Sequence, residues 1–107
     1  MTNLPDPVAA YFALAPDADA DALTAIFTTD AIVSDEHRDH QGIAAITAWR
    51  VDTMQRTPFV ARPLSVEVQD GQVIVPAEVT GAFPGSPLTL DHAFKLRDGR
   101  IAQLAIG

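Results

Sequence analysis

The chain has 107 residues, of which 48% are hydrophobic and 20% charged, a composition typical of one globular domain and unlike that of a disordered chain. Seven basic and fourteen acidic residues give a net charge of −7, so we expect no binding to nucleic acid or to an anionic membrane surface. No apolar run is long enough to span a bilayer, and the N-terminal segment has neither the basic start nor the long apolar stretch of a signal peptide. These features predict a cytoplasmic protein.

The first half of the chain predicts three helices and one strand. Asp6-Pro7 is a typical helix start, and the first helix ends before Pro16. Asp17, Asp19 and Asp21 precede a second helix, where acidic side chains favour the positive end of the helix dipole more often than they bind a metal. Residues 31–35 alternate like a strand, residues 36–41 form a polar loop, and residues 43–54 carry the apolar stripe of a third helix.

From Phe59 onward the hydrophobic period changes to two. The predicted strands cover residues 60–69, 72–83, 88–97 and 100–106. The dipeptides Asp70-Gly71 and Asp98-Gly99 indicate hairpin turns, because both turn positions favour positive φ. We therefore expect an α+β domain in which an antiparallel meander curls around the helices and leaves a conical barrel with an internal pocket.

The order helix–helix–strand–helix–four strands, together with the segment FTTDAIVSDEHRDHQGIAAITAW, resembles the nuclear-transport-factor-2-like superfamily, and its SnoaL-like and ketosteroid-isomerase-like branches most of all. The resemblance covers nearly the whole chain and implies a single SnoaL-like domain over residues 1–107. It also implies a conical α+β barrel, often dimeric, with a pocket between the helices and the concave sheet.

Three positions match catalytic positions of the ketosteroid isomerases. Asp35, at the end of the first strand, stands where those enzymes have their general base. Tyr11 matches their oxyanion-hole tyrosine, and His92 lies where they place a protonated aspartic acid. Trp49 replaces a pocket phenylalanine, the loop after Asp35 is about two residues shorter, and Tyr11 is the only tyrosine, so steroid isomerisation itself is not implied.

The residues alone leave the role of each position open. Asp35 shares a strand face with Ala31 and Val33, which favours an inward carboxylate acting as a general base, but it could also cap the loop or pair with Arg38. His92 lies on an apolar strand face and is either a core histidine or a hydrogen-bond donor to a developing oxyanion.

Tyr11 and Trp49 have similar alternatives. The Tyr11 ring could simply pack between helix and sheet, and only its combination with Asp35 and His92 favours a catalytic role. Trp49, Leu90 and Phe94 are predicted pocket walls.

The polar loop holds two histidines, His37 and His40, with acidic residues beside them. Because a loop lacks the fixed spacing of a helical metal motif, we expect no metal there, and we place His40 at the pocket mouth or in solvent. No glycine-rich phosphate loop or nucleotide fingerprint is present, so we expect no cofactor.

The sequence predicts a small-molecule pocket protein. One hypothesis is an isomerase or cyclase that transfers protons on an apolar carbonyl compound with Asp35 as base. The alternatives are a non-catalytic binder of a hydrophobic small molecule and a dimeric interaction domain. Val73, Val75 and Val79 occupy one face of the strand over residues 72–83, and Ile74 and Pro76 make its other face largely apolar, so we also expect a homodimer through the outer face of the sheet.

Overall fold

The structure, a computed structural model, describes residues 4–107, which form three helices and seven strands. In chain order these are α1 (Asp6–Phe12), α2 (Ala20–Ile26), β1 (Phe27–Asp35), β2 (Arg38–Gln41), α3 (Ile43–Arg56), β3 (Phe59–Pro63), β4 (Glu67–Gln69), β5 (Gln72–Gly81), β6 (Leu88–Arg97) and β7 (Arg100–Ile106). The predicted α+β class is confirmed.

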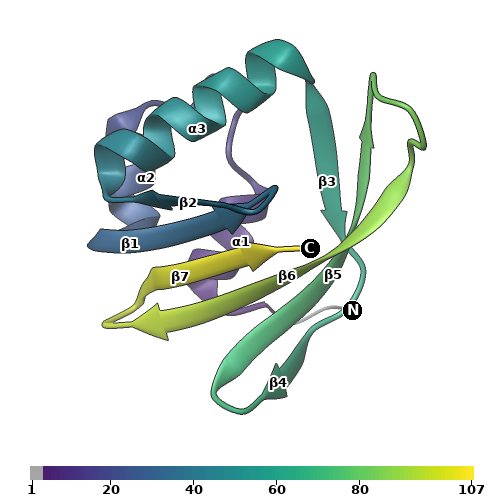
Figure 1. The fold of residues 1–107 in the computed structure, drawn as a ribbon. Coiled ribbons are helices and arrows are strands. Elements are labelled where there is room, and N and C mark those ends of the chain that lie inside the picture. The colour runs from purple at the N-terminus through teal and green to yellow at the C-terminus, as the bar shows by residue number, and fades with distance from the viewer. Residues whose placement is uncertain (1–3) are drawn as a thin grey trace.

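The strands form one curved, mixed sheet in the order β2-β1-β7-β6-β5-β3, with β4 paired to the other end of β5 (Figure 1). The meander from β5 to β7 is antiparallel, as predicted, but β1 runs parallel to β7. The sheet therefore differs from an all-antiparallel barrel, and it stays open between its outer strands. The parallel pair arises because α3 carries the chain from the β2 edge to the β3 edge before the meander returns, and a crossover, unlike a hairpin, permits parallel pairing.

The segment after β1 is a hairpin, where the sequence predicted a loop. β2 pairs antiparallel with β1, and Asp35 lies opposite Arg38. The two turn residues, Glu36 and His37, have φ values of 52° and 64°, the conformation of a two-residue hairpin turn. Glutamate seldom adopts positive φ, and neither turn residue is the glycine that usually marks such a turn, which is why the hairpin gave no clear signal in the sequence.

The predicted strand over residues 60–69 is divided into β3 and β4. Both pieces pair with β5, and Pro63 lies opposite Ala77 while Glu67 lies opposite Ile74. Three residues of one strand therefore face two of the other, which is the geometry of a bulge. The Leu64 N–H still donates to the Pro76 carbonyl at 2.9 Å, but Pro76 has no N–H to return a bond to Leu64, so the ladder is interrupted after this pair.

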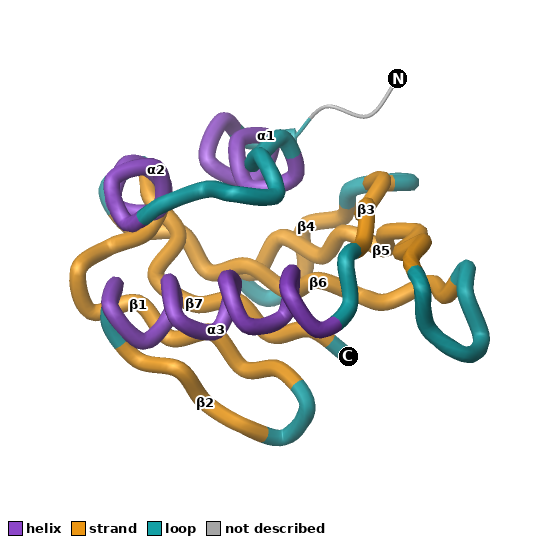
Figure 2. Tube along the Cα trace, turned by 90° about the horizontal axis from the view of Figure 1, so that it is seen from above, coloured by secondary structure: helices purple, strands orange, loops and turns teal. Residues whose placement is uncertain are grey.

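The helices cover the concave face of the sheet, and α1 and α2 lie along one side of α3 when the molecule is seen from above (Figure 2). Asp19 caps α2, since its carboxylate accepts a hydrogen bond of 3.0 Å from the Ala22 amide. Asp6, from the predicted helix start Asp6-Pro7, is the first residue of α1 and follows the N-cap residue Pro5, so its side chain does not cap the helix. One continuous core joins the helices to the sheet through buried side chains: Tyr11, Leu23, Phe27, Ile46, Phe94 and Leu104.

The outer face of the sheet carries some apolar side chains. Val60 is 70% exposed there, and Ile74 and Pro76 are partly buried. No helix of residues 4–107 is long and apolar enough to cross a membrane. Homodimer formation through this face stays a prediction.

Candidate functional site

A cavity of about 270 Å³ lies between α1, α3, the end of β1 and the concave side of β5 and β6. We call it the main cavity. Its wall is mostly apolar and includes Phe59, Val79, Phe83, Leu88, Leu90 and Ile106. The three predicted catalytic side chains, Asp35, Tyr11 and His92, all line it. An apolar hollow with a few convergent polar groups is the usual form of a small-molecule site.

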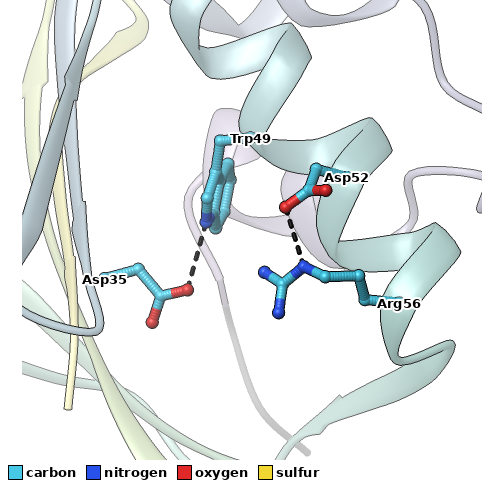
Figure 3. A network of polar contacts seen from close by, with 4 residues as sticks. All are labelled: Asp35, Trp49, Asp52 and Arg56. Atoms are coloured by element: carbon cyan, nitrogen blue, oxygen red, sulfur yellow. Dashed lines mark hydrogen bonds and ion pairs between the residues drawn. The ribbon is translucent and has the colours of Figure 1, made fainter.

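Asp35 ends β1, and the alternation of that strand turns its side chain inward. Ala31 and Val33, on the same face, are fully buried. The Asp35 Oδ2 atom accepts a hydrogen bond of 3.1 Å from the Trp49 indole Nε1–H (Figure 3). This bond fixes the orientation of the carboxylate, while the other carboxylate oxygen has no hydrogen-bond partner within residues 4–107.

Tyr11 lies on the buried face of α1 and is 3% exposed. Its ring makes edge contacts with Phe27 and Phe94. Burial raises the pKa of the hydroxyl to about 12; the positive charge of Arg50 acts against this shift, and the negative charge of Asp35 adds to it. The hydroxyl is therefore protonated at neutral pH and can donate a hydrogen bond.

His92 comes from β6 and is 3% exposed. Its Nδ1 atom lies 3.1 Å from the Leu90 carbonyl oxygen. A carbonyl can only accept, so this hydrogen bond places a proton on Nδ1. Burial lowers the pKa of His92, which favours the neutral ring, and the remaining nitrogen, Nε2, then carries a lone pair. In this state the Nε2 atom of His92 is a hydrogen-bond acceptor, and not the donor to an oxyanion that its sequence position suggested.

The predicted binding residues divide between two places. Trp49 and Leu90 line the main cavity, but Phe94 does not. Phe94 is fully buried in the core, where it packs against the Tyr11 ring at 5.7 Å between centroids. The alternation of β6 put it on the right face, but it lies beneath the tyrosine, away from the hollow.

His40 also lies outside the main cavity. It packs against Trp49, with 5.9 Å between ring centroids, and lines an open groove that adjoins the main cavity, since Asp35 and Trp49 line both. The hairpin explains this position, because β2 continues the sheet edge beyond β1 instead of folding over the cavity. Within residues 4–107 no three His, Asp or Glu side chains gather closely enough to hold a metal ion.

Sequence reasoning missed the polar groups that α3 brings to the cavity mouth. Arg56 lines the opening, and its Nε donates to the Asp52 carboxylate at 2.8 Å (Figure 3). Arg56 follows Trp49 by seven residues, which is two helical turns, so the two share a face of α3. This spacing was the available signal.

The comparisons with known proteins agree with this fold. The sequence profile of the SnoaL-like domain matches residues 8–104. A crystal structure from Sinorhizobium meliloti, described as a "putative polyketide cyclase", is 46% identical, with a TM-score of 0.88 over 97% of this chain and 95% of that chain.

Two further solved structures are more distant. Bal32a, from a soil-derived mobile gene cassette, is 25% identical, with a TM-score of 0.76 over 95% of this chain and 86% of that chain. A Catenulispora acidiphila protein of ketosteroid-isomerase-like fold, solved in complex with trimethylamine, is 18% identical, with a TM-score of 0.81 over 98% of this chain and 86% of that chain, and supports the fold alone. Among curated proteins, none matches.

The fold and its cavity define a small α+β protein of the nuclear-transport-factor-2-like type. More narrowly, the chain belongs to the SnoaL-like family.

Proposed function

We propose that this protein is an isomerase or cyclase that removes a proton next to the carbonyl group of a small apolar compound, with Asp35 as the general base. The observation that carries the proposal is the presence of Asp35, Tyr11 and His92 on the wall of one apolar cavity. A carboxylate and a protonated hydroxyl in one hollow are the groups that enolisation requires. The description of the 46% identical relative as a "putative polyketide cyclase" supports the same class of chemistry.

The proposed step begins when a carboxylate oxygen of Asp35 takes a proton from the carbon beside the substrate carbonyl. The electron pair of that C–H bond forms the enolate double bond, and negative charge moves onto the carbonyl oxygen. The Tyr11 hydroxyl donates a hydrogen bond to this oxygen, since its pKa of about 12 keeps it protonated. The Trp49 indole keeps the Asp35 carboxylate in place throughout.

The proton then leaves Asp35 by one of two routes. In an isomerase it returns to a carbon further along the conjugated enolate. In a cyclase the enolate carbon attacks a second carbonyl of the same molecule, and the resulting alkoxide takes the proton. His92, with a lone pair on Nε2, accepts a hydrogen bond from a hydroxyl or enol group of the ligand and orients it.

The size of the cavity limits the substrate. At about 270 Å³ it is slightly smaller than most small-molecule sites, which measure roughly 300–1,000 Å³. A substrate with one or two rings fits this volume. The apolar wall favours a ligand with few polar groups besides the reacting carbonyl.

The proposal is tested with cyclohex-3-enone, whose conversion to the conjugated enone is followed by absorbance and whose exchange of α-protons in D₂O is followed by NMR. We expect Asp35→Asn to lower both rates by roughly 10²–10⁴-fold, because it keeps the shape of the side chain and removes the base. Asp39→Asn is the matched control: this carboxylate lies in the same hairpin but does not line the main cavity.

Binding is measured separately. Trp49 is the only tryptophan and lines the main cavity, so its fluorescence reports occupancy directly. A normal rate in Asp35→Asn would remove Asp35 from the role of base. Ligand binding by the wild type without any proton exchange would instead support the alternative, a non-catalytic binder.

The expected homodimer belongs to the same proposal, since exposed apolar side chains on the outer face of the sheet favour association. Light scattering at micromolar concentration tests it. A strict monomer would contradict it.

A further inference from the structure

A second, smaller hollow lies on the other side of Tyr11. It has a volume of about 140 Å³ and is bounded by α1, the segment after it, α3 and β3. We call it the Arg50 cleft. It shares two walls, Tyr11 and Phe59, with the main cavity, and its remaining lining is Arg50 together with apolar side chains such as Leu14, Met54 and Ala61.

Arg50 is the unusual residue of this cleft. It lies on α3, is 5% exposed, and has a buried Nε atom without a hydrogen-bond partner within residues 4–107. Its guanidinium carbon lies 5.8 Å from the ring centroids of both Tyr11 and Phe59. These cation–π contacts compensate part of the desolvation of the charge, but they satisfy no N–H group in the plane of the guanidinium.

The other five arginines are all exposed to solvent, and three of them have a carboxylate partner. Arg56, Arg62 and Arg97 each form an ion pair, and their side chains are 56%, 69% and 52% exposed. Arg50 is buried and forms none, although residues 4–107 contain all fourteen carboxylates of the sequence. A buried charge normally has a partner of opposite sign, because burial without one is costly. No carboxylate of residues 4–107 supplies this partner, which leaves the Arg50 cation available to an anion from outside the chain.

The chemistry of the cleft defines that anion. A planar guanidinium matches the two oxygens of a carboxylate in a bidentate pair. The apolar lining suits an alkyl chain. A volume of about 140 Å³ corresponds to that of four or five water molecules, since one water occupies about 30 Å³ in the liquid, and this is space for a group of about six heavy atoms.

We propose that the Arg50 cleft is a binding site for an alkyl carboxylate, held by the Arg50 guanidinium and the apolar wall around it. The carboxylate belongs either to a free short-chain acid or to the end of a longer aliphatic ligand. The site is separate from the enolisation chemistry of the main cavity and does not depend on it.

The experiment uses sodium butyrate as the probe, with butyramide as its neutral isostere and sodium chloride at matched ionic strength. We expect a Kd in the millimolar range, since a ligand of this size makes few contacts. At about ten times Kd, butyrate should raise the Tm of the wild type by roughly 5 °C. Butyramide and chloride should change it by less than about 1 °C at the same concentrations.

Two arginine variants locate the site. Arg50→Met removes the buried charge and should lose the response to butyrate, with a Kd at least about tenfold higher. Arg100→Met removes an exposed charge at the start of β7 and should keep the full response. Because Arg50→Met also removes an unpaired buried cation, we expect it to fold, and Arg50→Lys tests whether charge without the planar fork is enough.

A third measurement does not depend on the stability of the variants. The Arg50 Nε–H signal in a ¹⁵N NMR spectrum should shift with butyrate and not with butyramide. Trp49 fluorescence should stay constant, because Trp49 lines the main cavity and not the cleft. A change in Trp49 fluorescence without an Arg50 shift would place the ligand in the main cavity and overturn the proposal.

The remaining outcomes are equally decisive. Tighter binding of octanoate than of butyrate supports the site and assigns the carboxylate to a longer ligand, whereas weaker binding assigns it to a short free acid. An equal response to chloride, an equal response in Arg50→Met, or no response at about 100 mM butyrate overturns the proposal.

Discussion

The main cavity and the Arg50 cleft share the walls Tyr11 and Phe59, but they present different polar groups to a ligand. The main cavity presents the carboxylate of Asp35 and the lone pair of His92, which both accept protons. The Arg50 cleft presents a buried guanidinium, which can only donate. The aromatic rings of Tyr11 and Phe59 thus lie between a place proposed for proton removal and a place proposed for an anion.

This difference shows how the environment of Tyr11 is set. Burial is the largest influence on its hydroxyl and raises the pKa, while the charge of Arg50 lowers it and the charge of Asp35 raises it. The hydroxyl therefore lies in the field of a cation from one hollow and of an anion from the other. It stays a proton donor at neutral pH.

The largest effect is expected from removing a side chain that supports the Tyr11 ring. Phe94 is fully buried and packs against Tyr11, so Phe94→Ala should lower the free energy of unfolding by about 3–5 kcal/mol. Both hollows should lose function together. Urea unfolding measures the effect, with Leu96→Ala on the same strand, a partly exposed position, as the milder control. A loss as small as that of the control would place Phe94 outside the support of Tyr11.

Removing only the Tyr11 hydroxyl should separate the two hollows. Tyr11→Phe keeps the ring and deletes the proposed donor to the enolate oxygen, so proton transfer should slow by roughly 10²–10³-fold, or about 2.7–4 kcal/mol. The Tm response to butyrate should stay unchanged, since it rests on Arg50. Equal losses in both assays would show that the hydroxyl belongs to the anion site as well.

His92, the buried acceptor in the main cavity, predicts a pH dependence of the free energy of unfolding. Burial lowers the pKa of His92 below its ordinary value of 6.5. As the pH falls through 6.5, His92 becomes protonated in the unfolded chain while it stays neutral in the native state. The free energy of unfolding therefore decreases until the pH reaches the lowered pKa of the native state.

Each pKa unit of difference contributes about 1.4 kcal/mol. Urea unfolding at about pH 7.5 and about pH 5 measures this loss. His92→Gln should reduce it, whereas His37→Gln, in the exposed turn, should leave it as in the wild type. An unchanged pH dependence in His92→Gln would mean that His92 does not resist protonation.

The smallest effect is expected at the mouth of the main cavity. Asp52 and Arg56 form an ion pair whose side chains are 62% and 56% exposed. Asp52→Asn should therefore leave the free energy of unfolding nearly unchanged, because solvent screens an exposed ion pair. The released Arg56 should increase the affinity of the main cavity for anionic ligands, which titration of Trp49 fluorescence with cyclohexanecarboxylate can measure. No change in affinity would show that Arg56 does not contact ligands.

Where the chain follows local rules, the sequence was enough to predict the structure. The turns at Asp70-Gly71 and Asp98-Gly99 have positive φ at both positions, and β6 and β7 cover the predicted ranges. The alternation of β1 correctly placed Asp35 on the inner face. These features depend on the steric limits of a few adjacent residues, which the sequence states directly.

The tertiary structure decided what depends on residues far apart in the chain. The parallel pairing of β1 with β7 and the bulge between β3 and β4 follow from how the ends of the sheet meet, and no local pattern encodes them. The burial of Arg50 without a carboxylate is of the same kind: an arginine on a helix normally reaches solvent, and only the packing of α1 and β3 against α3 encloses this one. The sequence determined which titratable and charged side chains this protein has. Only the packing placed Tyr11 between the acceptors Asp35 and His92 on one side and the Arg50 cation on the other. Burial and charge pairing depend on contacts between distant segments, which local sequence does not fix.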